Sequence, residues 1–297
     1  MCYELSSLSD VLVTCIKLAE RCSVEHVCPR RSSLSAVKLL SGFSAQSPLP
    51  TIFAITPTYA RLLQKAELIR IANTFRQVPA LHWIVVEDAN ESSKLVTNVL
   101  MKSLIPHTQL CVRTPKGVTK SRGTLQRNLG LEWLRRTFRP EDAPTGVVYF
   151  ADDDNTYSLE IFEEMRYTRK VSVWPVGFAG GLRYESVKVN AQGRVNGWLV
   201  AFDPSRPFAI DMAGFAVGLK LILEKQEVKF HLNVKIGYQE SSLLQDLVTI
   251  DELEPKAENC SKQMEMHDRN NQGQSYLECL LSLAVTLILG PMDFWVI

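Results

Sequence analysis

Two sequence patterns that commonly bind nucleotide phosphates are missing from this chain of 297 residues. No G-x-G-x-x-G follows the first predicted strand, and no G-x-x-x-x-G-K-S/T occurs anywhere. Both patterns place backbone N–H groups around phosphate oxygens. If the chain binds a nucleotide diphosphate, a metal ion and cationic side chains must neutralise the diphosphate instead.

Other absences argue against further classes of protein. None of the seven cysteines forms a C-x-x-C pair, which makes a zinc site of the common type unexpected. Lys plus Arg is 33 and Asp plus Glu is 32, so the basic excess of a nucleic-acid-binding protein is lacking, and we predict no nucleic-acid partner. No apolar run reaches the roughly 20 residues of a membrane span. The short apolar stretch Val11–Ile16 lacks the preceding basic residues of a signal peptide.

Hydrophobic residues make up 46% of the chain, which is enough for a large core. From residue 51 onward, short apolar strands alternate with amphipathic helices. The predicted strands are 51–56, 81–86, 109–112 and 146–151, and the predicted helices are 64–75, 94–103 and 124–138. This alternation is typical of an α/β fold with a mainly parallel sheet and helices on both faces.

The second half of the chain has longer loops. We predict a strand over 171–178 that is broken by Pro175, a hairpin that turns at Gly193, and helices over 215–223 and 241–248. The loops carry Arg, Glu, Asp, Tyr and Trp, which suit carbohydrate because aromatic faces stack on sugar rings and charged groups bond hydroxyls. Ordinary surface loops are the alternative interpretation.

The most informative stretch is Val147–Glu160, which reads VVYFADDDNTYSLE. An apolar strand runs directly into Asp152, Asp153 and Asp154. Three adjacent carboxylates repel one another unless a divalent cation, an arginine or sugar hydroxyls take up their charge. Mg²⁺ and Mn²⁺ prefer carboxylate oxygens and share them with substrate phosphates. From the local sequence alone, a solvated acidic turn that caps a helix is an equal alternative.

Polar clusters follow three of the predicted strands, at Thr56–Tyr59, at Glu87-Asp88 and at Asp152–Asp154. The carboxyl ends of parallel strands meet at one edge of the sheet, where open α/β sheets bind ligands. Arg122 and Arg127, around the start of the predicted helix 124–138, supply cations. The pattern therefore predicts a nucleotide site at this edge.

Nine segments, taken together, resemble the β-1,3-glucuronosyltransferases, glycosyltransferase family 43. They include PTIFAITPTYARLLQKAEL (50–68), GVVYFADDDNTYS (146–158) and GYQESSLL (237–244). The other segments are 81–89, 122–128, 171–177, 180–185, 206–217 and 253–262. The resemblance implies a GT-A type fold and an activity of the galactosylgalactosylxylosylprotein 3-beta-glucuronosyltransferase type. It also implies a UDP-sugar-binding half at 50–158 and an acceptor-binding half at 159–262, between a weakly ordered leader or stem (1–49) and a divergent tail (263–297).

The resemblance assigns the donor site residue by residue. Asp154 would hold Mn²⁺ against the UDP diphosphate, Asp153 would bond the ribose, and Asp152 would pair with Arg127. The uracil would be framed by Pro57, Tyr59 and Asp88, and the remaining UDP contacts would come from Arg122, His267 and Arg269. His267 and Arg269 keep the family spacing, but Met266 replaces the family's tryptophan and residues 270–297 have no counterpart.

For the acceptor, the resemblance assigns Glu240 as the catalytic base and Glu185, Arg206 and Asp211 as contacts to the acceptor sugar. An inverting transfer needs one base for the acceptor hydroxyl and a Lewis acid on the leaving diphosphate. Without the resemblance, Glu240 would be read as a helix N-terminal acid that complements the dipole. Arg206 would then be a plain surface cation, and Asp211 a turn residue.

The resemblance further implies a homodimer in the Golgi lumen or membrane that transfers glucuronate from UDP-glucuronate to the 3-OH of a terminal galactose. The tail 263–297 would weaken the dimer if it departs from the family's. The acceptor stays open, since PTYAR resembles the proteoglycan-linker enzyme whereas Phe202 and GYQESS resemble enzymes acting on N-acetyllactosamine ends. The sequons at Asn90 and Asn259 are candidate glycosylation sites. Two alternatives are a catalytically impaired isoform that binds UDP or a partner enzyme, and a Mg²⁺-dependent hydrolase.

Overall fold

The computed structural model describes residues 49–115, 117, 123–141, 143–177, 179 and 181–261, together with the backbone of 266 and 267. The described residues belong to a unit that begins at Leu49. The predicted leader 1–49 and tail 263–297 therefore lie outside the described residues, apart from Leu49 and the short backbone segment 266–267.

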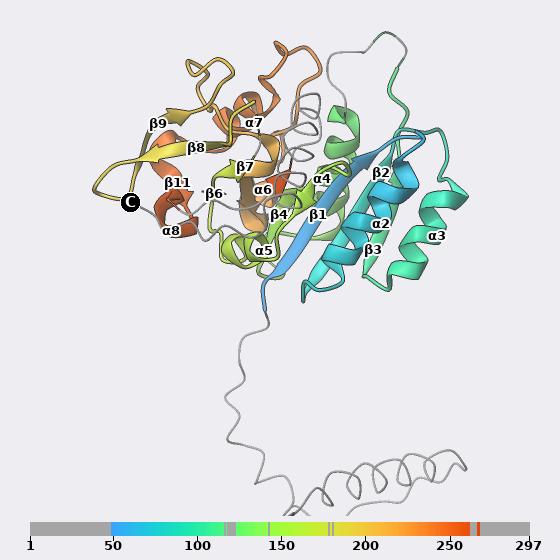
Figure 1. The fold of residues 1–297 in the computed structure, drawn as a ribbon. Helices are drawn as coiled ribbons and strands as arrows, with labels where there is room; N and C mark the ends of the chain where they lie inside the picture. Colours follow the sequence, from blue (N-terminus) through green and yellow to red (C-terminus); the bar gives the residue numbers. More distant parts are fainter. Residues whose placement is uncertain are drawn as a thin grey trace, which may run out of the picture. The chain divides into compact units, whose positions relative to one another are not determined.

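A seven-stranded sheet forms the centre of the unit (Figure 1), with the strand order β11-β6-β10-β4-β1-β2-β3. Its strands are β1 (Thr51–Thr58), β2 (Leu81–Glu87), β3 (His107–Cys111), β4 (Gly146–Phe150), β6 (Val171–Val173), β10 (Phe215–Gly218) and β11 (Leu253–Pro255). Strand β10 runs antiparallel to its neighbours β4 and β6, and the other pairs are parallel. The prediction of a mixed, mostly parallel sheet is confirmed.

Helices cover both faces of the sheet, as predicted. On one face lie α2 (Gln64–Phe75), α3 (Lys94–Ser103) and α5 (Glu160–Met165), and on the other lie α4 (Thr124–Thr137), α6 (Leu219–Glu224) and α7 (Gln239–Leu247). Successive residues of β1 point to opposite faces, so that Ile52 packs with the first helix layer and Phe53 with the second. Each fully buried aliphatic side chain stabilises the fold by about 1.5–3 kcal/mol relative to an exposed one.

The order of the strands places a ligand crevice beside β1. The chain leaves β1 for β2 and β3 on one side and then returns to add β4 on the other side. The carboxyl ends of β1 and β4 thus flank the point where the direction of strand addition reverses, which is the usual ligand position in open α/β sheets. Strands β6, β10 and β11 continue the same sheet beyond residue 158, so one sheet supports both predicted halves.

Strand β1 extends two residues further than predicted, and it includes Pro57. Thr58 O accepts a hydrogen bond from Asp88 N on the β2 side, so the nitrogen of Pro57 faces the β4 side. Strand β4 ends opposite Ile55, where Ala151 N donates to Ile55 O. The missing N–H of Pro57 therefore costs no ladder hydrogen bond, and the strand continues through the proline.

The predicted helix over 215–223 is wrong in its first half, because residues 215–218 form β10 between β4 and β6. Pairing on both sides overrides the local helical pattern. Gly218 ends the strand at a close approach, where an added Cβ would lie 2.4 Å from Arg169 O. Helices α2 and α3 match the predicted bounds, and α7 begins two residues before the prediction.

Smaller elements surround the main sheet. The predicted break at Pro175 separates β6 from β7 (Val176–Gly177), which joins β8 (Tyr184–Val189) and β9 (Val195–Leu199) in a second sheet that contains the expected hairpin. A third sheet pairs β5 (Thr156–Tyr157) with β12 (Met266–His267). Short helical turns are η2 (Met212–Gly214), η3 (Ile250–Glu252) and α8 (Ala257–Cys260). Within the described residues, no helix has the length and apolarity that crossing a membrane requires.

Candidate active site

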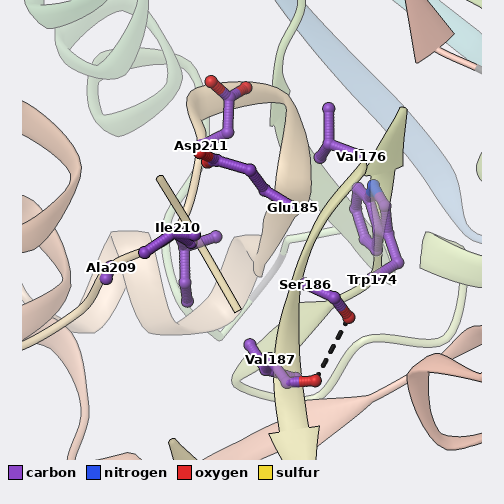
Figure 2. Close-up of a pocket in the computed structure, with 9 residues that line it drawn as sticks. Trp174, Val176, Glu185, Ser186, Val187, Ala209, Ile210 and Asp211 are labelled. Carbon is purple, nitrogen blue, oxygen red and sulfur yellow. Dashed lines mark hydrogen bonds between the residues drawn. The ribbon is translucent and has the colours of Figure 1, made fainter. Parts of the chain in front are cut away.

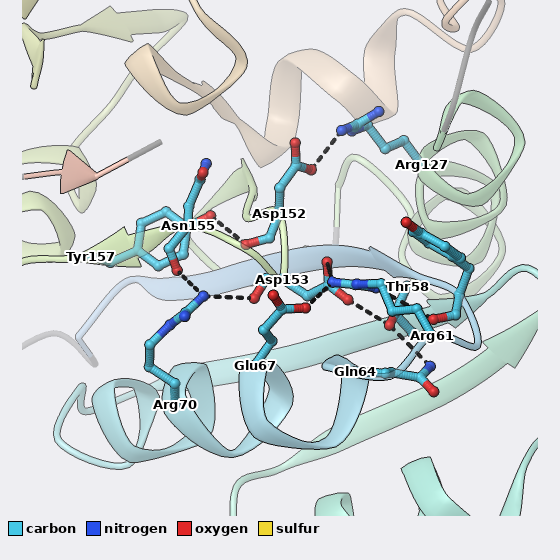
Figure 3. A network of polar contacts seen from close by, with 11 residues as sticks. Thr58, Arg61, Gln64, Glu67, Arg70, Arg127, Asp152, Asp153, Asn155 and Tyr157 are labelled. Atoms are coloured by element: carbon cyan, nitrogen blue, oxygen red, sulfur yellow. Dashed lines mark hydrogen bonds and ion pairs between the residues drawn. The ribbon is translucent and has the colours of Figure 1, made fainter. Parts of the chain in front are cut away.

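The three aspartates after β4 do not form a solvated turn, because two of them are paired with arginines from different elements (Figure 3). Arg127, in α4, lies with its Nη2 atom 2.5 Å from Oδ1 of Asp152. Arg61, just before α2, lies with its Nη2 atom 2.7 Å from Oδ1 of Asp153. The predicted Asp152–Arg127 pair is thus present, and the acidic loop is held at the carboxyl ends of β4 and β1.

Asp153 is buried, and both of its carboxylate oxygens have partners. The Thr58 hydroxyl, at the end of β1, donates to Oδ2 at 2.6 Å, while Arg61 holds Oδ1. Burial raises the pKa of Asp153, and the bonds from Arg61 and Thr58 oppose that rise. The negative charge of Asp153 therefore depends on these two partners.

Arg61 was not among the residues predicted from the sequence. It also pairs with buried Glu67, and its guanidinium lies 4.6 Å from the centre of the Tyr59 ring. Arg70 donates to the backbone carbonyls of Asp153 and Asn155 at 3.2 and 3.3 Å. A polar stripe at three-residue spacing faces the aspartate loop and consists of Arg61, Gln64, Glu67 and Arg70. This three-residue spacing at the start of a helix places the four side chains on one face, and it was the sequence pattern from which Arg61 could have been predicted.

Asp154 is the third carboxylate of the loop, and it is half-buried. Among the described residues, no group of three or more His, Cys, Asp or Glu side chains could enclose a metal ion. An exposed edge of a single carboxylate is the kind of oxygen ligand that Mg²⁺ and Mn²⁺ share with substrate phosphates and waters. The chemistry of the donor set therefore agrees with a divalent metal held jointly with a diphosphate.

The residues predicted to frame uracil lie at the carboxyl ends of β1 and β2. Tyr59 is 46% exposed and presents an aromatic face at this edge. Oδ1 of Asp88 accepts a hydrogen bond from Thr114 N at 2.9 Å, which ties the loop after β3 to the end of β2. Pro57 is the last residue but one of β1, and it pairs in register with Val86 of β2. The three predicted residues are thus brought to one edge of the sheet.

Glu240, the proposed catalytic base, lies in the first turn of α7. Its Oε2 atom is buried and has no hydrogen-bond partner within the described part of the chain. Burial raises the pKa of Glu240, while the charges of Arg127 and Arg206 oppose the rise. A carboxylate with an unoccupied buried oxygen and a raised pKa is suited to accept a proton near neutral pH.

A small pocket between β8 and the segment before η2 contains two of the three predicted acceptor contacts (Figure 2). Glu185 and Asp211 line the pocket together with Trp174. Oε1 of Glu185 accepts from Ala201 N at 3.1 Å, and Oδ1 of Asp211 accepts from Ala213 N at 2.9 Å, so backbone bonds fix both carboxylates. The pocket therefore holds two carboxylates whose positions are fixed by backbone hydrogen bonds.

Arg206, the third predicted acceptor contact, is buried but does not line that pocket. Its Nη1 atom donates to Gly237 O at 2.6 Å, and its Nε atom donates to Asp203 O at 3.3 Å. The guanidinium also lies 5.1 Å from the centre of the Phe202 ring. Two backbone carbonyls thus hold the guanidinium of Arg206 in place, and these contacts were not predicted from the sequence.

One tyrosine connects the aspartate loop to the pocket. Tyr149, in β4, is fully buried and donates to Ala213 O at 3.1 Å. Burial raises the pKa of Tyr149 well above its ordinary value, and the charges of Asp211 and Asp152 add to the rise. The Tyr149–Ala213 hydrogen bond therefore ties β4, which leads into the aspartate loop, to the turn that follows Asp211.

Some predicted residues cannot be placed. Arg122 and Arg269 lie outside the described residues, and so does the side chain of His267. The backbone of His267 pairs with Thr156 in the β12–β5 ladder, two residues beyond Asp154. The candidate glycosylation residues Asn90 and Asn259 are both exposed.

Comparison with known proteins gives the family. Residues 71–271 match the model of glycosyltransferase family 43. This chain belongs to that family. The chain is 57% identical over 234 residues to human galactosylgalactosylxylosylprotein 3-beta-glucuronosyltransferase 1, with 75% of this chain and 70% of the relative covered. It is 54% identical over 228 residues to human galactosylgalactosylxylosylprotein 3-beta-glucuronosyltransferase 2, with the same shares covered.

The family assignment confirms the resemblance seen in the nine sequence segments. Among solved structures, residues 1–349 of S. aureus TarS align with this family 43 chain at 13% identity and a TM-score of 0.46, covering 82% of this chain and 67% of TarS. This structural similarity is too distant to support the family assignment, which rests on the family model and on the relatives of 54–57% identity.

Proposed function

We propose that this chain is an inverting glycosyltransferase that moves glucuronate from UDP-glucuronate to the 3-OH of a terminal galactose on a glycan. Membership of glycosyltransferase family 43 and 57% identity to a named 3-beta-glucuronosyltransferase support the reaction class. The structural observation that carries the proposal is the buried Oε2 of Glu240 in the first turn of α7, which has no hydrogen-bond partner among the residues that the structure describes.

In this proposal, the donor lies across the carboxyl ends of β4, β1 and β2. Uracil stacks against Tyr59 and reaches Asp88 beside Pro57, while the ribose bonds Asp153. Asp154 would hold a divalent metal, Mn²⁺ in our proposal, and that metal supplies Lewis-acid stabilisation of the UDP leaving group. Arg122, Arg127, His267 and Arg269 would supply the cationic surroundings of the diphosphate and the sugar.

Glu240 takes the proton from the attacking hydroxyl of the acceptor. The raised pKa of Glu240 brings it closer to the pH at which a base works best. Glu185 and Asp211 orient the acceptor galactose by accepting hydrogen bonds from its hydroxyls, and Arg206 completes that grip. Attack from the face opposite UDP gives a β-linked product in a single displacement.

The acceptor in this proposal ends in galactose, in agreement with the galactosylgalactosylxylosylprotein named for the relatives. An N-acetyllactosamine end is the second acceptor to be tested. No described residue favours the non-catalytic alternative, and the β12–β5 ladder brings the backbone of His267 toward the aspartate loop. We further propose that the chain works as a homodimer in the Golgi and not with nucleic acid.

The test is a transfer assay with UDP-glucuronate, Mn²⁺ and either a galactosyl-galactosyl-xylosyl acceptor or an N-acetyllactosamine acceptor. We expect glucuronate transfer to at least one acceptor by the wild-type chain and almost none by Glu240→Ala. A chain that binds UDP with Mn²⁺ but transfers to neither acceptor would instead be a binding protein.

A further inference from the structure

A cluster of polar side chains outside the assigned site joins two loops beside Glu240. Oδ2 of Asp203 accepts a hydrogen bond from the Tyr238 hydroxyl at 2.6 Å and lies 3.0 Å from the Lys235 amine. Oδ1 of Asp203 accepts from the Ser205 hydroxyl at 2.5 Å. Asp203 follows β9, whereas Lys235 and Tyr238 directly precede α7. The cluster therefore links segments that are distant in sequence.

The same two loops are joined at two further points. Arg206 donates to Gly237 O at 2.6 Å, and the Ser241 hydroxyl donates to Phe208 O at 2.6 Å. Both residues on the first loop belong to the segment that leads to Asp211. The first turn of α7, which carries Glu240, is therefore fastened to the segment that carries the proposed acceptor contacts.

Two residues of these loops have a positive φ, which side-chain-bearing residues rarely adopt. Asp203 has a φ of 37°, a left-handed conformation that few residues other than glycine adopt. Gly237 has a φ of +76°, and an added Cβ would lie 2.4 Å from the Phe202 ring. Such conformations persist where the surrounding contacts hold them, and they concentrate at functional sites.

We propose that Asp203 and Tyr238 are positioning residues that set the distance between the base Glu240 and the acceptor sugar. The inference rests on the proposed transferase function. Neither residue is assigned a contact with the donor or the reacting atoms. Because a misplacement of about 1 Å can reduce a rate by roughly 10²-fold, a link between the base and the acceptor loop controls the reaction without touching it.

The Tyr238–Asp203 bond carries most of this effect. A short hydrogen bond to a carboxylate is among the stronger polar interactions in proteins. The Lys235 side chain is 65% exposed, so its ion pair with Asp203 is screened by water and contributes little. Lys235 also donates to the Tyr238 hydroxyl at 3.3 Å and lies 4.6 Å from the centre of the Tyr238 ring, and water screens these contacts in the same way. Lys235→Met leaves the Tyr238–Asp203 bond in place and therefore serves as a control within the same cluster. Tyr167→Phe, at a tyrosine that is 64% exposed, is a control for loss of a hydroxyl.

The experiment compares Tyr238→Phe, Asp203→Asn and the double variant in the transfer assay, with UDP affinity measured by calorimetry. Each single variant should lower kcat/KM for the acceptor by about tenfold or more, and UDP affinity should stay within about twofold of wild type. The double variant should lose no more than the worse single variant, because both changes break one link. Lys235→Met and Tyr167→Phe should transfer at nearly the wild-type rate.

Three results would overturn the inference while leaving the proposed function intact. They are wild-type acceptor kinetics in both single variants, additive losses in the double variant, and an equal loss of UDP affinity, which would indicate general damage to the fold. A wild-type chain that transfers nothing would contradict the proposed function itself, so the two failures are distinguishable.

Discussion

The Nη2 atom of Arg61 lies 2.7 Å from Oδ1 of Asp153, although 92 positions separate them in the sequence. The same guanidinium also pairs with Glu67. One arginine therefore balances two carboxylates whose side chains are only 8% and 4% exposed, and it does so beside the proposed ribose position.

Replacing Arg61 should damage both the fold and the donor site. Arg61→Met would remove the guanidinium that pairs with buried Asp153 and Glu67, and we expect a loss of about 3 kcal/mol in the free energy of unfolding. We also expect at least a tenfold loss of UDP affinity, because Asp153 would lose the partner of Oδ1 that holds its carboxylate in place for the ribose. Chemical denaturation and a UDP titration measure these two effects.

The matched control for that variant is Arg136→Met. Arg136 pairs with Glu132 on the surface of α4, where the two side chains are 76% and 49% exposed. Such a pair contributes about 0.5 kcal/mol or less. If both variants lose the same small amount, then Arg61 does not balance the buried charges as described.

Replacing the proposed base should separate catalysis from binding. We expect Glu240→Gln to lower kcat by about 10²–10⁴-fold while UDP affinity is kept, because Glu240 acts only on the acceptor hydroxyl. Steady-state kinetics together with UDP calorimetry test this expectation. Comparable losses in kcat and UDP affinity would place Glu240 in the donor site instead.

The raised pKa of Glu240 gives the same variant an effect on stability. Burial raises this pKa above the ordinary value of 4.5, so the folded chain binds the proton more tightly than the unfolded chain. The wild type consequently loses stability as the pH rises from 4.5 through the folded-state pKa. Glu240→Gln should be more stable than the wild type at neutral pH, with the difference vanishing below pH 4.5. A constant difference across that range would show that ionisation is not the cause.

The metal prediction concerns Asp154. We expect Asp154→Asn to weaken Mn²⁺-dependent UDP binding by at least about tenfold, since the amide removes the negative charge that would bind the metal, and even residues that only support a metal ligand change metal affinity by about 10–100-fold. UDP titrations of both chains, with Mn²⁺ and with EDTA, measure the effect. Equal UDP affinity with and without Mn²⁺ in the wild type would refute a metal-bridged diphosphate.

Gly237 provides a prediction about the backbone. Gly237→Ala combines a positive φ with a clash against Phe202, whereas Gly181→Ala has a similar φ of +81° with no atom within 4 Å of the added Cβ. The Gly181 variant should lose about 1–2 kcal/mol in the free energy of unfolding. The Gly237 variant should lose more than the Gly181 variant, because its added Cβ also meets Phe202. Thermal unfolding of both variants measures the difference, and equal losses would contradict the prediction.

Much of the architecture was predictable because local patterns and global packing agree. The predicted strand 146–151 is a short apolar run and the helices 64–75 and 94–103 show hydrophobic periodicity; the structure has both helices at these bounds and the strand at Gly146–Phe150. The segment 215–218 was misread because its four residues carry no strand period. It becomes a strand only by pairing with β4 and β6, which are distant in the sequence.

The site was predictable where its residues cluster in sequence and not where they are assembled by the fold. The three consecutive aspartates were recognisable from the local sequence, and the resemblance to the family indicated Glu240. Arg61 and Tyr238 were missed because their partners, Asp153 and Asp203, lie 92 and 35 positions away. No local pattern encodes such a pairing.

The most direct test of the central claim is the anomeric configuration of the transferred sugar, measured by proton NMR on the product of the transfer reaction. UDP-glucuronate carries its sugar in the α configuration. A single displacement with Glu240 as the base predicts a β-linked glucuronate on the galactose 3-OH. An α-linked product, or free glucuronate without transfer, would contradict the account.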